Sequence, residues 1–143
     1  MLSKKAKYAI KAVLYIAKHH DRGTPVFSAE IADAERIPRK FLEAILRDLK
    51  NAGILSSQRG SGGGYFLQKS ASDITLAEIM RLCDGPIAML PCVSEKFYRP
   101  CAECVNEAKC AIHIVFHQIR STTFSILMNA TIEKMNNIFP EEA

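Results

Sequence analysis

The chain has 143 residues, of which 48% are hydrophobic and 24% charged, and it carries a formal net charge of +4 and five cysteines. This length is enough for one domain with a buried core, and the hydrophobic content excludes a disordered chain. No apolar run is long enough to span a membrane, and Lys11 and Lys18 interrupt the first apolar stretch, which argues against a signal peptide. We therefore expect a cytoplasmic protein with no membrane partner and with reduced cysteines.

The charge is unevenly distributed along the chain. Residues 1–70 contain 13 Lys and Arg against 6 Asp and Glu, a net charge of +7, whereas residues 71–143 contain 6 and 9, a net charge of −3. A basic first half is typical of a DNA-facing module, but a solvated basic face would give the same charge.

Two helices are predicted at the start of the chain. Ser3 is expected to cap a helix that ends near His20, because apolar side chains recur there at three- and four-residue steps. Ser28 is expected to cap a short helix over residues 29–35, which a tight turn at residues 36–38 ends.

A third helix and a hairpin follow. The helix is expected from Pro38 or Arg39 to Ala52, with Gly53 as its left-handed cap. Residues 54–59 and 65–67 are predicted to be two strands around a glycine-rich tip, and two short helices followed by a hairpin indicate a winged helix-turn-helix. The third helix is expected to bury Phe41, Leu42, Ile45, Leu46 and Leu49.

The second half is predicted to contain a short helix, a loop and a long helix. Thr75 to Glu78 has the pattern of a capping box, and residues 84–86 end the helix that it opens. The long helix is expected from about Val105 to Asn137, with a coiled-coil-like seam. The seam is formed by Ile112, Phe116, Ile119, Thr123, Ile126 and Ala130. The fold class is mainly α, with a DNA-binding domain at 1–83, a cysteine-rich sensor loop at 84–111 and a dimerisation helix at 105–139.

Polar side chains early in the third helix are candidates for DNA contact. Arg39 or Lys40 could bind guanine or phosphate, and Glu43 could accept from a cytosine amino group. Alternatively these residues are exposed polar groups, with Glu43 and Arg47 paired one turn apart.

The glycine-rich hairpin tip offers a second DNA-binding surface. Arg59 could enter a minor groove, and phosphates could be bound by Ser57, Ser61 and the backbone N–H groups of Gly62 and Gly63. A nucleotide-binding phosphate loop is excluded because no Gly-Lys-Ser/Thr follows, but a plain flexible tip remains an alternative.

Four of the five cysteines lie in one nineteen-residue stretch, at Cys92, Cys101, Cys104 and Cys110, and His113 follows one turn later. Thiolates bind iron–sulfur clusters and zinc, so this stretch predicts a metal site or a redox-sensitive site. Cys83 stands apart among apolar neighbours, and we expect it to be packed in the interior.

Two segments carry a resemblance to a known family. Residues 38–57, Pro-Arg-Lys-Phe-Leu-Glu-Ala-Ile-Leu-Arg-Asp-Leu-Lys-Asn-Ala-Gly-Ile-Leu-Ser-Ser, and residues 59–65, Arg-Gly-Ser-Gly-Gly-Gly-Tyr, resemble the Rrf2 family of bacterial repressors. Residues 3–9 and 74–79 also match, so the resemblance covers nearly the whole chain. It implies a homodimer, whose long carboxy-terminal helix crosses its partner, bound to a partly palindromic double-stranded DNA operator.

The resemblance also implies which residues approach DNA. Pro38 stands where many relatives carry Ser, which removes one potential base contact. The candidate DNA-binding residues are Ser28, Arg39, Lys40, Glu43, Ser57, Arg59, Ser61, Gly62, Gly63 and Tyr65.

Sensing members of the family hold an iron–sulfur cluster on three cysteines and a variable fourth ligand, usually with five residues between successive cysteines. The five residues between Cys104 and Cys110 fit this pattern, and His113 resembles the fourth ligand of one branch. The upstream part departs from it, because eight residues separate Cys92 from Cys101 and one cysteine is extra. The resemblance thus implies a [2Fe–2S] or [4Fe–4S] cluster, with zinc as the lesser alternative.

The sequence therefore predicts a DNA-binding regulator, a repressor, controlled by a cluster that senses redox state, nitric oxide or iron–sulfur status. The alternatives are a metal-free thiol switch and a zinc-stabilised winged-helix regulator or protein adaptor. Cys101-x-x-Cys104 also has the spacing of a thiol oxidoreductase, but no βαβ context is readable, so we expect no enzyme.

Overall fold

The computed structural model describes residues 2–60 and 63–139, and within them the chain is mainly helical with one two-stranded sheet. No helix among the described residues is long and apolar enough to cross a bilayer. The elements in chain order are α1 (Lys4–Lys18), η1 (His20–Arg22), α2 (Ser28–Glu35), α3 (Arg39–Asn51), β1 (Leu55–Gln58), β2 (Gly64–Leu67), α4 (Leu76–Asp84), η2 (Pro91–Val93), η3 (Glu107–Lys109), α5 (Ala111–Asn129) and α6 (Ile132–Asn136).

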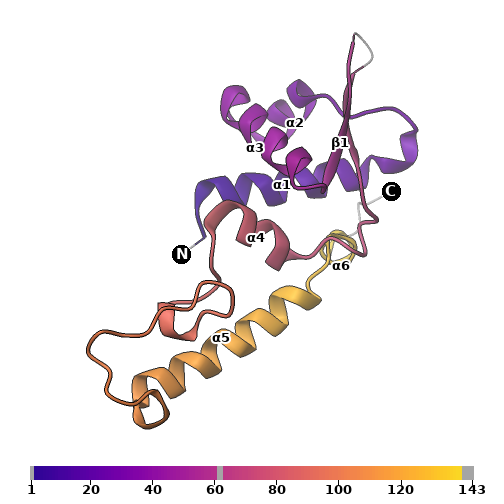
Figure 1. Ribbon diagram of the computed structural model, residues 1–143. Helices are drawn as coiled ribbons and strands as arrows, with labels where there is room; N and C mark the ends of the chain where they lie inside the picture. The colour runs from indigo at the N-terminus through magenta and orange to yellow at the C-terminus, as the bar shows by residue number, and fades with distance from the viewer. Residues whose placement is uncertain (1, 61–62, 140–143) are drawn as a thin grey trace.

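The elements form a winged helix with a long helical extension. Figure 1 shows α1 between the α2–α3 pair and α4, with the β1–β2 wing rising beside α3 and α5 running away from this body. The segment between α4 and α5 folds back along the first turns of α5 (Figure 1), and α6 returns to pack on α1. The predicted fold class is therefore confirmed.

Helix α1 begins at the predicted cap, because the Ser3 hydroxyl accepts a hydrogen bond from the Ala6 N–H at 3.0 Å. Its buried face is the centre of the core. The fully or nearly fully buried side chains of this face are Ala6, Ala9, Ile10, Ala12, Val13 and Ile16.

The α2–turn–α3 unit has the predicted order with one correction at its start. Ser28 is the first residue of α2 rather than its cap; Phe27 occupies the cap position and makes no side-chain capping hydrogen bond. The chain turns at Arg36, whose φ of 56° lies in the left-handed region, and the Ile37 N–H donates to the Ala32 carbonyl.

Helix α3 buries Leu42, Ile45, Leu46 and Leu49, as predicted. Phe41 was expected in this face, but its side chain is 45% exposed and packs edge-on against Tyr8 of α1, at a ring distance of 5.8 Å. The helix ends in a Schellman arrangement at Gly53 (φ 79°), where the N–H groups of Gly53 and Ile54 donate to the carbonyls of Lys50 and Leu49. The predicted glycine cap is thus confirmed.

The wing is an antiparallel hairpin in which Ser57 pairs with Tyr65 and Gln58 with Gly64. Its glycines are required by close packing of the backbone. A Cβ on Gly63 would lie 2.4 Å from the Gln58 carbonyl oxygen, and one on Gly64, whose φ is 145°, would lie 2.7 Å from that of Val26. Both distances are shorter than any ordinary carbon–oxygen contact, so larger residues would force the hairpin open.

Helix α4 has half of the predicted capping box. The Thr75 hydroxyl accepts from the Glu78 N–H at 3.2 Å, but the Glu78 carboxylate is bound by Lys69 at 2.8 and 2.9 Å instead of returning to the cap. Gly85, with φ 81°, ends the helix at the predicted place.

The predicted single helix from Val105 to Asn137 is wrong at its start and near its end. Helix α5 begins at Ala111, after Cys110 caps it, and the backbone breaks at Ala130 before Thr131 caps α6. Because Cys110 caps the helix, α5 starts at Ala111 and not at Val105. The break at Ala130 lets Ile132 reach the core, where it is fully buried. Within the predicted seam Ile112, Ile119 and Ile126 are exposed, whereas Phe116 and Ala130 are half-buried against their own chain.

Candidate functional site

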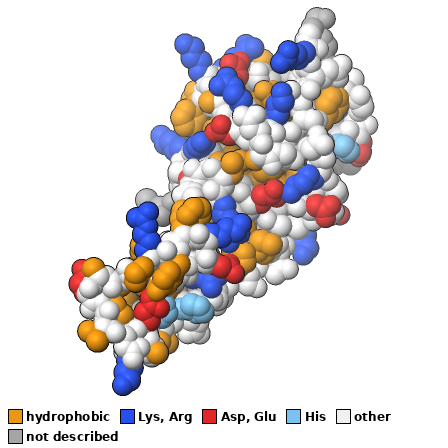
Figure 2. Space-filling view, in the orientation of Figure 1, with side chains coloured by type: hydrophobic (Ala, Val, Ile, Leu, Met, Phe, Trp, Pro, Cys, Tyr) orange, Lys and Arg blue, Asp and Glu red, His pale blue; other side chains and the backbone are white. Residues whose placement is uncertain are grey.

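The outer face of α3 carries the predicted base-reading side chains. Arg39, Lys40 and Glu43 are all exposed in the first two turns of the helix. Arg39 Nε lies 3.3 Å from Glu43 Oε1, so the one-turn pair is Arg39–Glu43 and not the Glu43–Arg47 pair that was the sequence alternative. Figure 2 shows Lys and Arg side chains gathered at the end of the molecule that carries α2, α3 and the wing. This face can receive an anionic polymer.

The candidate DNA-binding residues of the wing differ in how accessible they are. Arg59 is exposed just beyond β1, and Ser57 is half-exposed on it. The Gly63 N–H was expected to be free for a phosphate, but it donates to the Gly60 carbonyl at 2.9 Å. Ser61 and Gly62 lie outside the described residues.

The remaining two candidates are tied to the body of the domain. Tyr65 pairs with Val26, each backbone N–H donating to the other's carbonyl, at 2.8 and 2.9 Å, and the Tyr65 side chain is half-buried. Ser28 is half-buried in the first turn of α2. The Val26–Tyr65 bridge joins the wing to the chain entering α2.

A charged network fixes α2 against α1. Arg22 binds both carboxylate oxygens of Glu30, at 2.6 and 2.9 Å, and the Tyr15 hydroxyl donates to the same carboxylate at 2.9 Å. The Arg22 guanidinium beside it holds the pKa of Glu30 below its ordinary value, and Tyr15 acts in the same direction. The Tyr15 pKa is raised, first by burial and then by Glu30. This network sets the position of α2 against α1.

The four clustered cysteines and His113 line one cavity of about 440 Å³ beside the start of α5. The five predicted ligand residues are thus brought around one space. The other lining residues are Leu90, Pro91, Arg99, Pro100, Ala102, Glu103 and Ile112. The wall is therefore mostly apolar apart from the sulfur and nitrogen donors and two charged side chains.

Cys110 lies at the start of α5, and Cys104 is close to it. The Cys110 sulfur accepts the His113 N–H at 3.4 Å and so caps α5. Partial burial, followed by the neighbouring Cys110, raises the pKa of Cys104. An N–H group aimed at a sulfur is the type of contact that stabilises a cluster-bound thiolate.

Cys101 and Cys92 are the other two cysteines that line the cavity. Cys101 is exposed, and its thiol donates to Glu103 at 3.1 Å, which raises the pKa of Cys101. Cys92 is half-buried in η2. Cys83 lies on α4, half-buried outside the cavity, and burial raises its pKa, in line with a packing role.

The donor set fits an iron–sulfur cluster in its chemistry. Four free thiols are a complete set of ligands, and His113 Nδ1 is a buried nitrogen that has no hydrogen-bond partner. Among the described residues, however, no three His, Cys, Asp or Glu side chains converge closely enough to share one metal ion. Binding a cluster therefore requires the segment 92–110 to close around it.

The chain matches the family model described as Rrf2, an iron-dependent transcriptional regulator, over residues 2–137. The chain belongs to the Rrf2 family. Its members are transcriptional regulators that bind DNA, and not enzymes, which confirms the family and the class of function predicted from the sequence.

Two named relatives of this Rrf2 protein share much of its sequence. An rrf2-like HTH-type transcriptional regulator of Rhodobacter capsulatus is 42% identical over 137 residues, which cover 94% of this chain and 91% of the relative. The HTH-type transcriptional regulator IscR of Photobacterium profundum is 31% identical over 140 residues, covering 96% and 77%.

Solved structures of two regulators have the same fold. CymR, the global cysteine regulator of B. subtilis, superposes with a TM-score of 0.80 at 27% identity, covering 97% of this chain and 98% of CymR. IscR of T. potens superposes with a TM-score of 0.74 at 22% identity, covering 96% and 86%, and supports the fold alone.

Two residues beside the Rrf2 cysteine cavity were not anticipated from the sequence. The Tyr98 hydroxyl donates a hydrogen bond to the Glu107 carboxylate, which raises the pKa of Tyr98 and joins the two halves of the cysteine segment. The segment has no periodicity, so no sequence signal identifies this pair.

Proposed function

We propose that this protein is a homodimeric repressor whose affinity for its operator is controlled by an iron–sulfur cluster. Cys92, Cys101, Cys104 and Cys110 are the candidate ligands, and His113 is the alternative to one of them. The single observation that carries the proposal is the cavity that all five residues line. Membership of a family described as iron-dependent supports it.

The DNA-binding part extends to residue 83, and its residues have separable roles. Arg39, Lys40 and Glu43 meet base edges in the major groove, as the exposed first turns of a recognition helix do. Arg59 and Ser57 contact the backbone or minor groove from the wing, and Ser61 and Gly62 at its tip are assigned to phosphates with them. Ser28 and Tyr65 border this surface. Gly63 acts by shaping the tip, because its N–H is already used.

Homodimerisation is supported by an exposed apolar stripe on α5. Ile112, Val115, Ile119 and Ile126 recur at steps of three, four and seven residues, and their side chains are 61%, 52%, 41% and 64% exposed. Figure 2 shows hydrophobic side chains gathered over this helix. A solvated helix would not keep such a stripe, whereas two copies crossing along it would bury both. The dimer also gives two recognition helices for a palindromic site.

Control of DNA binding follows from the position of the cavity. A cluster supplies iron–sulfur bonds that oxygen, nitric oxide or iron shortage can break. The thiols of Cys92 and Cys101 come from the segment that follows α4, and Cys110 caps α5. Drawing these sulfurs together orders residues 92–110 between the DNA-binding domain and the dimer helix, and their loss relaxes the segment.

The first test is metal analysis of protein purified without oxygen. A visible absorption band with near-equal iron and acid-labile sulfide per chain supports the cluster. About one zinc per chain would make the cysteines a structural site, and no metal after reconstitution would leave a thiol switch. Either of the last two results overturns the proposed cluster.

Cysteine variants then test the link to DNA. Cys104→Ala and Cys110→Ala are expected to remove the cluster and make operator binding insensitive to iron supply. Cys83→Ala is the matched control, since Cys83 is a half-buried cysteine outside the cavity, and it should respond as the wild type does. A wild-type response in the Cys104 and Cys110 variants contradicts the mechanism.

A further inference from the structure

Glu95 connects the cysteine segment to two helices at once. Its Oε2 lies 3.5 Å from Arg120 Nη1 of α5 and 3.9 Å from Arg81 Nη2 of α4. Arg81 belongs to the last helix before the cysteine segment, and Arg120 lies in the middle of the long helix. One carboxylate thus bridges the DNA-binding domain and the proposed dimer helix.

The two guanidinium groups are much less exposed than their partner. The side chains of Arg120 and Arg81 are 15% and 25% exposed, against 60% for Glu95. Arg120 Nε is buried without a hydrogen-bond partner, and the Arg81 guanidinium lies 4.5 Å from the centre of the Phe124 ring. Two partly desolvated cations close together repel each other, so the shared carboxylate is what makes their arrangement favourable.

Glu95 also follows the anchored part of the cysteine segment. Between Gly85 and Cys110 the buried residues are Val93 and Ser94, directly after Cys92. The Ser94 hydroxyl accepts the Phe97 N–H at 3.1 Å, which turns the chain away after Glu95. The chain between Cys92 and Glu95 is therefore buried, and Glu95 lies three residues after a candidate ligand.

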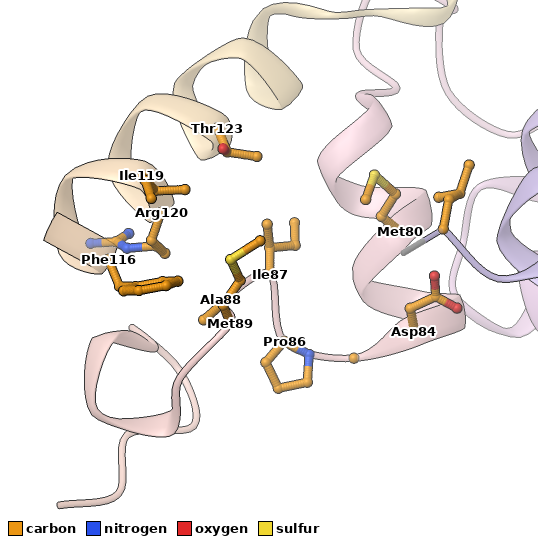
Figure 3. Close-up of a pocket in the computed structure, with 12 residues that line it drawn as sticks. Met80, Asp84, Pro86, Ile87, Ala88, Met89, Phe116, Ile119, Arg120 and Thr123 are labelled. Atoms are coloured by element: carbon orange, nitrogen blue, oxygen red, sulfur yellow. The ribbon is translucent and has the colours of Figure 1, made fainter. Parts of the chain in front are cut away.

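Direct packing between α4 and α5 is interrupted beside this bridge. A pocket of about 270 Å³ separates them, as Figure 3 shows, with Phe116, Ile119 and Thr123 of α5 on one side and Met80 and Asp84 of α4 on the other. The segment Pro86–Met89 lies between the two helices (Figure 3). On this side a pocket lies between the two helices, and the ion pairs of Glu95 with Arg81 and Arg120 join them beside it. At its other end α4 is tied to the end of α5, because the Leu76 N–H donates to the Ala130 carbonyl at 2.9 Å.

We propose that Glu95 is the positioning residue that couples the cysteine site to DNA binding, by holding Arg81 and Arg120 in a fixed relation when residues 92–110 are ordered. This inference rests on the proposed function. Glu95 binds neither cluster nor DNA: it acts through the two arginines. The spacing of the two recognition helices in a dimer depends on how α4 is held against α5.

The test compares Glu95→Gln with wild type, each cluster-loaded and cluster-free. The measured quantity is the ratio of operator dissociation constants between the two forms. The variant is expected to bind iron and sulfide at wild-type levels and to have the same visible spectrum. Its ratio of dissociation constants should move toward one by about fivefold or more, which is the lower end of ordinary allosteric coupling. Glu133→Gln, an exposed glutamate on α6, is the matched control.

Arg81→Gln and Arg120→Gln should also move the ratio toward one, and adding Glu95→Gln to either should change it little further. A Glu95→Gln protein that keeps the wild-type ratio overturns the coupling role while leaving the cluster intact. Wild-type protein that takes up no cluster overturns the proposed function, and this inference with it.

Discussion

Arg39 Nε lies 3.3 Å from Glu43 Oε1, one turn along the recognition helix α3. The two side chains are 64% and 47% exposed, and an exposed pair at this spacing contributes only about 0.3–0.5 kcal/mol to stability. The pair can therefore open at low cost when DNA is bound. While closed, it keeps both side chains on the outer face of α3, so their proposed role in DNA binding can be tested separately from folding.

Replacing Arg39 with alanine is expected to weaken operator binding without measurable loss of stability. If Arg39 is bidentate to guanine, the loss is about 1–3 kcal/mol and is confined to sequences with that base. If it binds phosphate, the loss is similar for all sequences, and the slope of log affinity against log salt concentration becomes shallower by about one. Titrations at several salt concentrations distinguish the two, and unchanged affinity would remove Arg39 from the interface.

Replacing Gly63 with alanine should damage the wing selectively. The new Cβ would lie 2.4 Å from the Gln58 carbonyl, so the hairpin tip must rearrange and operator affinity should fall at least about tenfold, or 1.4 kcal/mol. Gly23→Ala is the control, because Gly23 has φ 72° with open space around it and lies outside the hairpin. It should cost about 1–2 kcal/mol of stability and leave DNA affinity unchanged. Equal DNA affinity in both variants would contradict a role for the wing.

Local signals were sufficient to predict much of the fold. The Ser3 cap, the Gly53 cap and the hydroxyl half of the Thr75 box depend on neighbours within four residues. Errors appeared where distant contacts compete with local preference. Phe41 follows the apolar period of α3, yet it lies at the edge of the core against Tyr8. Likewise, the core accepts Ile132 only because the last helix breaks at Ala130.

The candidate site was predictable in composition but not in geometry. The cysteine cluster and the nearby His113 gave five candidate ligands, all of which are among the residues that line the cavity, and the resemblance named a cluster. Spacing could not show that Glu95 reaches Arg81 and Arg120, since those contacts join residues far apart in the chain. Nor could it show that the Gly63 N–H is used within the tip.

The Arg22–Glu30 pair predicts a pH-dependent stability difference. Because the pKa of Glu30 is lower in the folded than in the unfolded protein, its contribution is complete above the unfolded value near 4.5 and is lost as the pH falls through the folded value. Glu30→Gln should therefore lower the free energy of unfolding by about 1.5–3 kcal/mol at neutral pH. In urea titrations this difference should shrink progressively below the unfolded pKa.

Asp33→Asn is the control for Glu30→Gln, because Asp33 is an exposed acidic residue on the same helix. It should change the free energy of unfolding by less than about 0.5 kcal/mol. A Glu30→Gln difference that stays constant down to strongly acidic pH would mean that packing, and not the ion pair, holds α2.

The exposed stripe on α5 makes a prediction about assembly. Ile119 lies in the middle of the stripe and is 41% exposed in the single chain. In a symmetric dimer Ile119→Glu places two carboxylates in an apolar interface, and an unpaired buried charge costs about 3–5 kcal/mol. The variant should therefore sediment as a monomer at concentrations where wild type is dimeric, with weaker operator binding. Gln118→Glu adds the same charge one residue earlier, off the stripe, and should remain dimeric. If the two variants sediment alike, the dimer is formed by another surface.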